Sequence, residues 1–171
     1  GAGFYLNLLF LKVLNALLSV SEVKHEWMSK NISGSISESI LDFGFINAFR
    51  DRLWRSFFDS SKGLFVSQID LAGVQKKQYS LETQLWCIEE NLFSQQISDQ
   101  QLWMNLRRSE LLLSMVGRPV WPDYENSEIS WTTKAVGLRH YHDRFRWSWL
   151  IAETLKVAQI VGDVEFAHQM N

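Results

Sequence analysis

The hydrophobic pattern of the chain is mostly helical, and it begins with a stretch that is apolar on nearly every side. Between Phe4 and about Ser21, apolar residues occupy most of the helical circumference, which indicates a helix buried on nearly all sides. The segment Lys24–Gly34 is polar, and we interpret it as a connection. From about Ser37 to Phe58, apolar residues return at helical spacing behind a serine suited to the N-cap, so a second helix is expected.

The middle of the chain predicts one short extended segment followed by two helices. The run Leu64–Asp70 shows partial alternation and β-branched residues, which is typical of extended chain. A helix is expected from its N-cap Ser80 to about Leu92. Another is expected from Ser98 to about Val116, because Ser98 and Gln101 have the spacing of a capping box.

The segment Gly117–His142 has the least regular pattern and contains both prolines of the chain. A loop of this length is uncommon in a compact domain unless it has a function. A helix is then expected from about Arg144 to Val161, where Gly162 interrupts it. Asp163 is placed to cap a last helix at the end of the chain.

The composition fits one globular domain that spans residues 1–171. Hydrophobic residues make up 46% of the chain, and the net charge of −2 arises from both signs spread along it. Because a general nucleic-acid binder usually carries a basic face, no nucleic-acid partner is expected. Asn7, Lys12 and Asn15 make the apolar N-terminal run too polar for a membrane span, so no membrane partner is expected either.

The single cysteine, Cys87, excludes an internal disulfide framework. It lies in the apolar run LWCI, which predicts a buried and inert thiol. Nothing in the sequence requires an oxidising compartment, so we expect a cytoplasmic protein.

Several segments resemble the six-hairpin glycosidases. FRDRLWRSFFDSSKGLFVSQ, residues 49–68, resembles a helix of that family that ends in an aromatic-rich turn, and YSLETQLWCIEENLFS, residues 79–94, resembles the inner helix that follows. GRPVWPDYE, YHDRFRWSWL and the closing VGD resemble the last hairpins of the same barrel. These motifs look most like those of the amylo-α-1,6-glucosidase and glucoamylase-like enzymes.

The resemblance implies an all-α fold of antiparallel helical hairpins, arranged as about half of an (α/α)6 toroid. Twelve helices of average length do not fit the chain, so it corresponds to the C-terminal half. The implied reaction is hydrolysis of an O-glycosidic bond, in an α-glucoside, by two carboxyl groups that are roughly 6.5–9.5 Å apart in inverting enzymes. The family's general acid would lie upstream of Gly1, so the isolated chain is expected to be incomplete or inactive.

The stretch WPDYE, residues 121–125, is the leading candidate for the remaining catalytic carboxylate. Asp123 and Glu125 lie beside two aromatic residues in a proline-bounded loop, and the sequence does not decide between them. Apolar neighbours raise a carboxyl pKa and basic neighbours lower it, so such a loop suits acid–base chemistry. Trp121 is assigned to the substrate pocket. The alternative is a solvated surface turn, where Asp and Pro are common.

A second group of substrate-binding candidates lies in RHYHDRFRWSW, residues 139–149. Arg144 can hold carboxylates or sugar hydroxyls through forked hydrogen bonds, and His142 and Trp147 are assigned to the same pocket. Trp147 and Trp149 are two residues apart, so on a helix they would not share one face. The alternative is a capped helix start with structural ion pairs.

Glu82 and Gln84 are candidates because the resemblance places inner-helix starts against the sugar. Their side chains would then form hydrogen bonds with sugar hydroxyls. The alternative for Glu82 is that it complements the helix dipole in the first turn.

No metal or other cofactor is expected. His140 and His142 lack a third ligand at suitable spacing, and no glycine-rich phosphate loop occurs. The expected partners are a carbohydrate and, because the apolar face of Phe4–Leu18 needs cover, a second copy or the N-terminal half of the barrel. The same face supports an alternative function, a non-catalytic helical module that binds proteins through its exposed inner helices.

Overall fold

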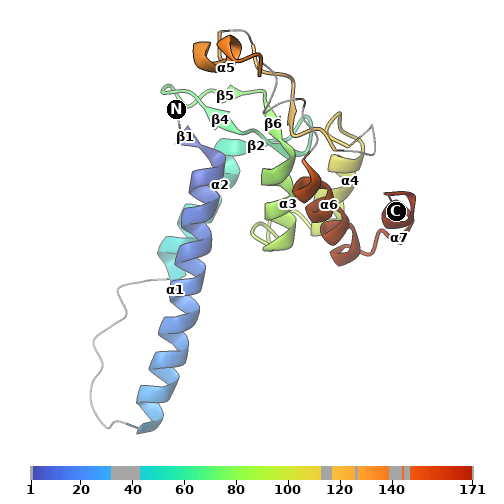
Figure 1. Ribbon diagram of the computed structural model, residues 1–171. Helices are drawn as coiled ribbons and strands as arrows, with labels where there is room; N and C mark the ends of the chain where they lie inside the picture. Colours follow the sequence, from blue (N-terminus) through green and yellow to red (C-terminus); the bar gives the residue numbers. More distant parts are fainter. Residues whose placement is uncertain are drawn as a thin grey trace.

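Helices dominate the part of the chain that the structure describes. The computed structural model describes residues 2–31, 43–112, 117–125, 127–138, 144 and 147–170 (Figure 1). Helix α1 is the longest, and its C-terminal half extends beyond the other elements (Figure 1). The helices are α1 Phe4–Asn31, α2 Phe43–Phe57, α3 Leu81–Glu89, α4 Asp99–Arg107, α5 Trp131–Ala135, α6 Ser148–Ile160 and α7 Val164–Met170.

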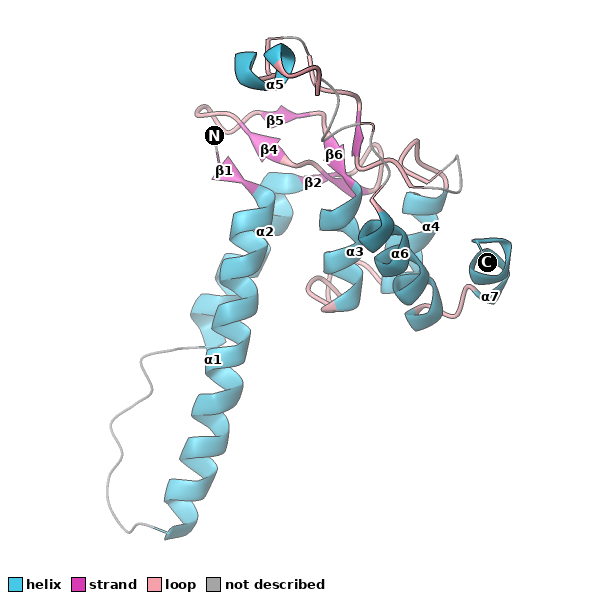
Figure 2. Ribbon diagram, viewed as in Figure 1, coloured by secondary structure: helices cyan, strands magenta, loops and turns pink. Residues whose placement is uncertain are grey.

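The strands of the described residues are two residues long and form three antiparallel sheets (Figure 2). One sheet places β4 between β1 and β5, and the other two pair β2 with β3 and β6 with β7. The β6–β7 pair brings the loop after Gly117 to the start of α3. The strands are β1 Ala2–Gly3, β2 Phe58–Asp59, β3 Leu64–Phe65, β4 Gln68–Ile69, β5 Gln75–Lys76, β6 Tyr79–Ser80 and β7 Val120–Trp121.

The predicted all-α fold is wrong, because the architecture is mixed. Helices hold 55% of the residues and strands 10%, so the chain is not plainly half of an (α/α)6 toroid of antiparallel hairpins. A two-residue strand is too short to show an alternation of apolar and polar residues. Such strands are formed by backbone hydrogen bonds and need no apolar face, so the sequence pattern does not reveal them. The predicted extended segment Leu64–Asp70 is confirmed, but it contains two strands, β3 and β4, that belong to different sheets.

Three helix starts agree with the sequence, but the helix predicted from about Arg144 begins at Ser148 as α6 and ends at Ile160, close to the predicted Val161. Helix α3 begins directly after Ser80, and α4 begins after Ser98, whose hydroxyl accepts a hydrogen bond from the Gln101 N–H at 3.2 Å. Asp163 accepts a hydrogen bond from the Phe166 N–H at 3.1 Å at the start of α7. Helix α4, however, ends at Arg107, before the predicted end near Val116.

Helix α1 continues through much of the predicted connection Lys24–Gly34 and ends at Asn31. The polar composition of this segment predicts a loop, but it also suits a helix that projects from the body of the protein (Figure 1). The predicted N-cap Ser37 of the second helix lies outside the described residues, and α2 is described from Phe43.

Helices α1, α3 and α6 lie in a row with α3 in the middle, and each has a partner helix. Helix α2 packs on α1, α4 on α3 and α7 on α6. Two glutamates at the C-terminal end of α3 hold its neighbours, since Glu90 forms an ion pair with Lys12 of α1 and Glu89 with Lys156 of α6. Figure 1 shows the three helices running in the same direction away from the sheets.

Aromatic rings join the start of α1 to the rest of the core. The Phe4 ring stacks on Phe57 and Phe65, with centroids 4.7 and 4.9 Å apart, and Phe65 contacts Phe93 at 4.7 Å. All four residues are buried. Cys87 is buried as predicted, and burial raises the pKa of its thiol well above the ordinary value.

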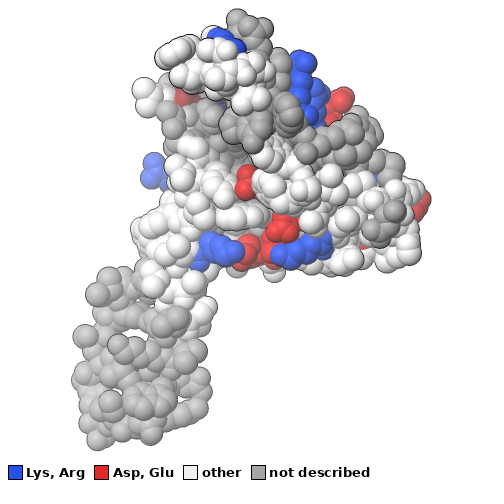
Figure 3. All heavy atoms as spheres, viewed as in Figure 1, with Lys and Arg blue, Asp and Glu red and all other residues white. Residues whose placement is uncertain are grey.

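The surface shows no extended patch of one charge on the face drawn in Figure 3, where basic and acidic groups are interspersed among uncharged ones. Among the helices described, none combines the length and the apolar character needed to cross a membrane.

Candidate functional site

A cavity of about 460 Å³ lies where α1, α3 and α6 begin. Tyr5 comes from the first turn of α1, Glu82 from the first turn of α3 and Trp149 from the first turn of α6, while Tyr124 follows β7. Neither Ser80 nor Trp147 caps its helix with a side-chain hydrogen bond. The other lining residues are Gly3, Ser67, Gln68, Ser80, Thr83, Pro119, Val120, Trp147 and Leu150.

Glu82 supplies a partly buried carboxyl group to this cavity. Burial raises its pKa above the ordinary glutamate value, and a hydrogen bond with Tyr5 offsets part of that effect. Burial and the neighbouring carboxylate also raise the pKa of Tyr5, so its hydroxyl keeps its proton and donates to Glu82. The Tyr5 ring packs against Trp86, with centroids 5.0 Å apart. A carboxyl group with a raised pKa in a cavity is suited to donate a proton.

Four aromatic residues form much of the cavity wall, namely Tyr5, Tyr124, Trp147 and Trp149. The expectation that Trp147 and Trp149 would not share one face of a helix does not apply, because Trp147 lies before α6, and both residues line this cavity. Trp147 precedes α6 with an extended backbone, φ −92° and ψ 124°, so helical spacing does not relate the two rings. Trp147 also packs against the core, whereas Trp149 is about half exposed.

Gln84 lies near Glu82 on α3 but serves the core instead of the cavity. Its side-chain amide accepts a hydrogen bond from the Phe65 N–H at 3.0 Å and donates to the Phe65 carbonyl at 2.8 Å. The residue is fully buried. Both ends of the amide are therefore used to dock β3 on α3, and the predicted contact with substrate is not available to it.

Asp123 is held between two arginines. One carboxylate oxygen accepts from Arg118 Nη2 at 2.7 Å and the other from Arg144 Nε at 2.6 Å. Asp123 does not line the cavity, but the next residue, Tyr124, does. Asp123 and Arg144, both predicted to be in the site, thus pair with each other and position the loop that carries Tyr124.

Glu125 and Trp121 also lie away from the cavity. Glu125 is exposed at a turn, where its N–H donates to the Glu128 carboxylate at 2.7 Å. Trp121 stacks on Tyr79 with centroids 6.0 Å apart and lines a separate cavity of about 210 Å³. The catalytic role of Asp123 or Glu125 stays a prediction, and the structure does not place either carboxylate beside Glu82.

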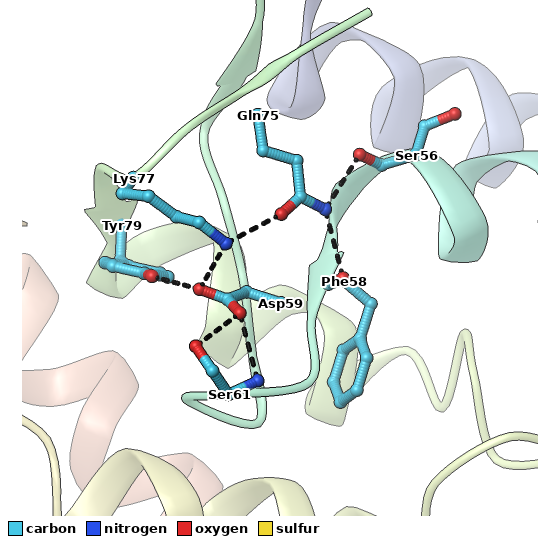
Figure 4. Close-up of polar contacts among 7 residues, drawn as sticks. All are labelled: Ser56, Phe58, Asp59, Ser61, Gln75, Lys77 and Tyr79. Atoms are coloured by element: carbon cyan, nitrogen blue, oxygen red, sulfur yellow. Dashed lines mark hydrogen bonds and ion pairs between the residues drawn. The ribbon is translucent and has the colours of Figure 1, made fainter.

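A network around Asp59 holds β6, the strand before α3, through the Tyr79 hydroxyl (Figure 4). One Asp59 oxygen accepts from the Ser61 N–H and hydroxyl at 3.0 and 2.7 Å, and the other accepts from Tyr79 and Lys77 at 2.5 and 2.8 Å. Burial alone would raise the Asp59 pKa, but these hydrogen bonds outweigh it and hold the pKa far below the ordinary value. Lys77 also donates to Gln75 at 3.0 Å. With all acceptor positions used, Asp59 is a structural group.

The sequence thus identified two residues of the cavity, Glu82 and Trp147, and missed Tyr5 and Tyr124. Tyr5 lies in an apolar run that predicts a core position. The only hint of a polar role in the sequence is its hydroxyl group, which needs a hydrogen-bond partner when it is buried. His142 lies outside the described residues. Within those residues, no cluster of three histidine, cysteine or acidic side chains is arranged to hold a metal ion.

Any inference about the function of this chain rests on its fold and its cavity, because comparisons with known proteins identify no relative. No protein-family model matches the chain, and no curated protein and no solved structure is significantly similar to it.

Proposed function

We propose that the cavity at the starts of α1, α3 and α6 binds a sugar ring and that Glu82 is the proton donor of a glycosidase-like site. The observation that carries the proposal is a carboxyl group with a raised pKa in a cavity walled by four aromatic residues. Its volume of about 460 Å³ lies within the usual range of small-molecule sites. The motif resemblance points to an α-glucoside as the substrate class.

The aromatic wall suits a sugar because a pyranose ring has an apolar C–H face and polar hydroxyls around its edge. Trp147 and Trp149 offer flat apolar surfaces. Polar residues lie among them, including Gln68, Ser80 and Thr83. Polar groups at the wall of a mostly apolar cavity can fix the orientation of a ligand through hydrogen bonds.

Glu82 would act at the glycosidic oxygen. Its protonated carboxyl group gives the proton to the leaving oxygen while the bond between that oxygen and the anomeric carbon breaks. Tyr5 donates to the carboxylate that results and so orients it. A complete reaction also needs a base or nucleophile on the other side of the ring.

The base is not supplied by the cavity residues described, since Glu82 is their only acidic side chain. Asp123 and Glu125 flank Tyr124 in the chain, but neither lines the cavity, and Asp123 has both oxygens occupied by arginines. We therefore expect this chain to bind a sugar without hydrolysing it at a measurable rate.

Isothermal titration of the chain with maltose tests the proposal. Trp149→Ala should weaken binding by about two- to tenfold, because one aromatic contact contributes about 0.5–1.5 kcal/mol. The matched control is Trp131→Ala, because Trp131 is an exposed tryptophan on α5 that does not line the cavity. Cellobiose, which has a β linkage, serves as the comparison ligand and should bind more weakly than maltose.

Two results would contradict the proposal. The first is the absence of any sugar-dependent heat at tens of millimolar ligand. The second is a loss of affinity in Trp131→Ala that equals or exceeds the loss in Trp149→Ala, since binding would then be outside the cavity.

A further inference from the structure

Helix α1 has an exposed apolar face on the side opposite the core. Its members are Leu6, Phe10, Val13 and Leu17, and their exposed fractions range from 49% to 69%. We call these four residues the α1 stripe. The core-facing side of the same helix carries other residues, including Phe4, Leu8 and Leu11, which are fully buried. The stripe is therefore a second apolar face of α1, in addition to the face that packs into the core of the same chain.

The α1 stripe has no charged residue in it. Lys12 is the only charged residue between Phe4 and Ser19, and it forms an ion pair with Glu90 of α3 on another side of the helix. A helix face that meets only water normally carries charged or polar side chains. An uncharged row of large apolar side chains of this length is typical of a face that packs against another protein surface.

The apolar surface continues from α1 onto α2. The Phe10 ring meets the edge of Phe49 at a centroid distance of 5.4 Å, and Phe49 stacks on Phe45 at 6.4 Å. Phe45 is itself about half exposed. The stripe and Phe45 together form one surface on the α1–α2 pair.

We propose that a second copy of this chain covers the α1 stripe in an antiparallel, two-fold arrangement. The stripe residues are separated by four, three and four positions, which is the spacing of a coiled-coil seam. This spacing reads the same in both directions. A two-fold axis between residues 11 and 12 therefore sets Leu6 against Leu17 of the second copy, and Phe10 against Val13, so a large side chain faces a small one in both central layers.

The apolar surface area that two copies would bury is consistent with a weak dimer. The exposed parts of the stripe and Phe45 sum to about 500 Å² per chain when each large apolar side chain is taken as about 150–250 Å². Two copies would bury about 1,000 Å², which is at the lower limit for a specific interface. Complexes near this limit are weak, so we expect a dissociation constant of about 1–50 µM. The dimer is independent of the sugar-binding proposal.

Sedimentation equilibrium over a concentration series tests the pairing. The wild-type chain should form dimers, and Val13→Asp should weaken dimerisation by at least about tenfold, because it places two charges in the centre of an apolar seam. The matched control is Leu71→Asp, since Leu71 is almost fully exposed in the turn between β4 and β5, and its dimerisation should equal that of the wild type. Circular dichroism confirms that both variants keep their helices.

Thiol cross-linking tests the direction of the pairing. Leu6→Cys mixed with Leu17→Cys should give a cross-linked dimer with a short bis-maleimide, whereas each variant alone should give little. Cys87 is buried and contributes little background.

Three results would overturn the proposal. A chain that stays monomeric at about 100 µM would contradict the dimer. The stripe would then bind a different protein, since exposed apolar patches of this kind mark interfaces. A dimer that Val13→Asp does not weaken would form through another surface. Cross-linking of Leu6→Cys with itself would show parallel pairing.

Discussion

At the scale of single residues, two carboxyl groups of this protein have opposite environments. Glu82 is partly buried with one donor, Tyr5, and its pKa is raised. Asp59 is buried with four donor groups, and its pKa is lowered. The comparison explains why Glu82 suits proton transfer while Asp59 holds structure.

The raised pKa of Glu82 predicts the pH dependence of stability. A carboxyl group whose pKa is higher in the folded state stabilises the fold most below its unfolded pKa, about 4.3, and this contribution is lost as pH rises through the folded value. Glu82→Gln does not titrate, so its free energy of unfolding should rise relative to that of the wild type between pH 4 and pH 8. Urea denaturation at a series of pH values measures the difference.

Tyr5→Phe provides a second variant for this prediction. It removes the donor that lowers the Glu82 pKa, so the carbon NMR titration of that carboxyl group should move to higher pH. Wild-type and Glu82→Gln stabilities that run parallel across the pH range would show that the carboxyl group is not perturbed by the fold.

Asp59→Asn is expected to lower the free energy of unfolding by about 3 kcal/mol at pH 7, because it breaks charge-assisted hydrogen bonds in a buried network. The lowered Asp59 pKa gives stability that is complete above the unfolded value of about 3.9 and is lost as pH falls below it. The wild type should therefore lose its advantage over Asp59→Asn in acid. Chemical denaturation at pH 7 and pH 3 measures both effects.

Asp70→Asn is the control for that substitution. Asp70 is exposed, and the single oxygen that accepts from the Ala72 and Val74 N–H groups has a counterpart in asparagine. Its stability should change by less than about 0.5 kcal/mol. Equal losses in the two variants would contradict the structural role of the Asp59 network.

At the scale of elements, the helix starts bring the site together. Helices α1, α3 and α6 begin at the cavity, and each contributes residues to its wall. Capping differs among the helices, since Ser98 caps α4 with its hydroxyl whereas Ser80 does not cap α3. At the start of α3 the Leu81 N–H donates instead to the Pro119 carbonyl at 2.8 Å, which joins the chain before β7 to the helix that carries Glu82.

Ser98→Ala should lower the free energy of unfolding by about 1 kcal/mol, because it removes the hydrogen bond to the Gln101 N–H. Ser80→Ala is the matched variant and should cost much less, since Ser80 makes no side-chain cap bond. Thermal or urea unfolding of both variants measures the contrast. A larger loss for Ser80→Ala would mean that its hydroxyl caps α3 in solution.

Most helices and the extended segment Leu64–Asp70 could be predicted from the sequence, while the pairing of the strands, the short helix α5 and several helix boundaries could not. Apolar periodicity and the caps at Ser98 and Asp163 correctly located α4 and α7, because these signals depend on residues close in sequence. The strand pair Tyr79–Ser80 with Val120–Trp121 depends on residues about forty positions apart, and no local pattern encodes it. The contacts of Asp123 with Arg118 and Arg144 were not predicted from the sequence either, because they depend on how the loop folds and not on a local pattern.

At the scale of the whole molecule, the row of helices α1, α3 and α6 packs against a buried core and also carries two exposed surfaces, the cavity and the α1 stripe. The partner helices α2, α4 and α7 and the Phe4 cluster form the closed core. The cavity lies at the N-terminal ends of these three helices, and the α1 stripe is exposed to solvent along α1. We propose that the cavity binds a sugar and that the α1 stripe binds a second copy of the chain.

Sugar binding among the starts of α1, α3 and α6 is tested most directly by NMR, with the tryptophan indole N–H signals followed during a titration with maltose. The chain has eight tryptophans, and two of them, Trp147 and Trp149, line the cavity. Saturable shifts should be confined to these two indoles and to backbone amides near Tyr5 and Glu82. Shifts centred on Trp131, or an unchanged spectrum at saturating sugar, would contradict the claim.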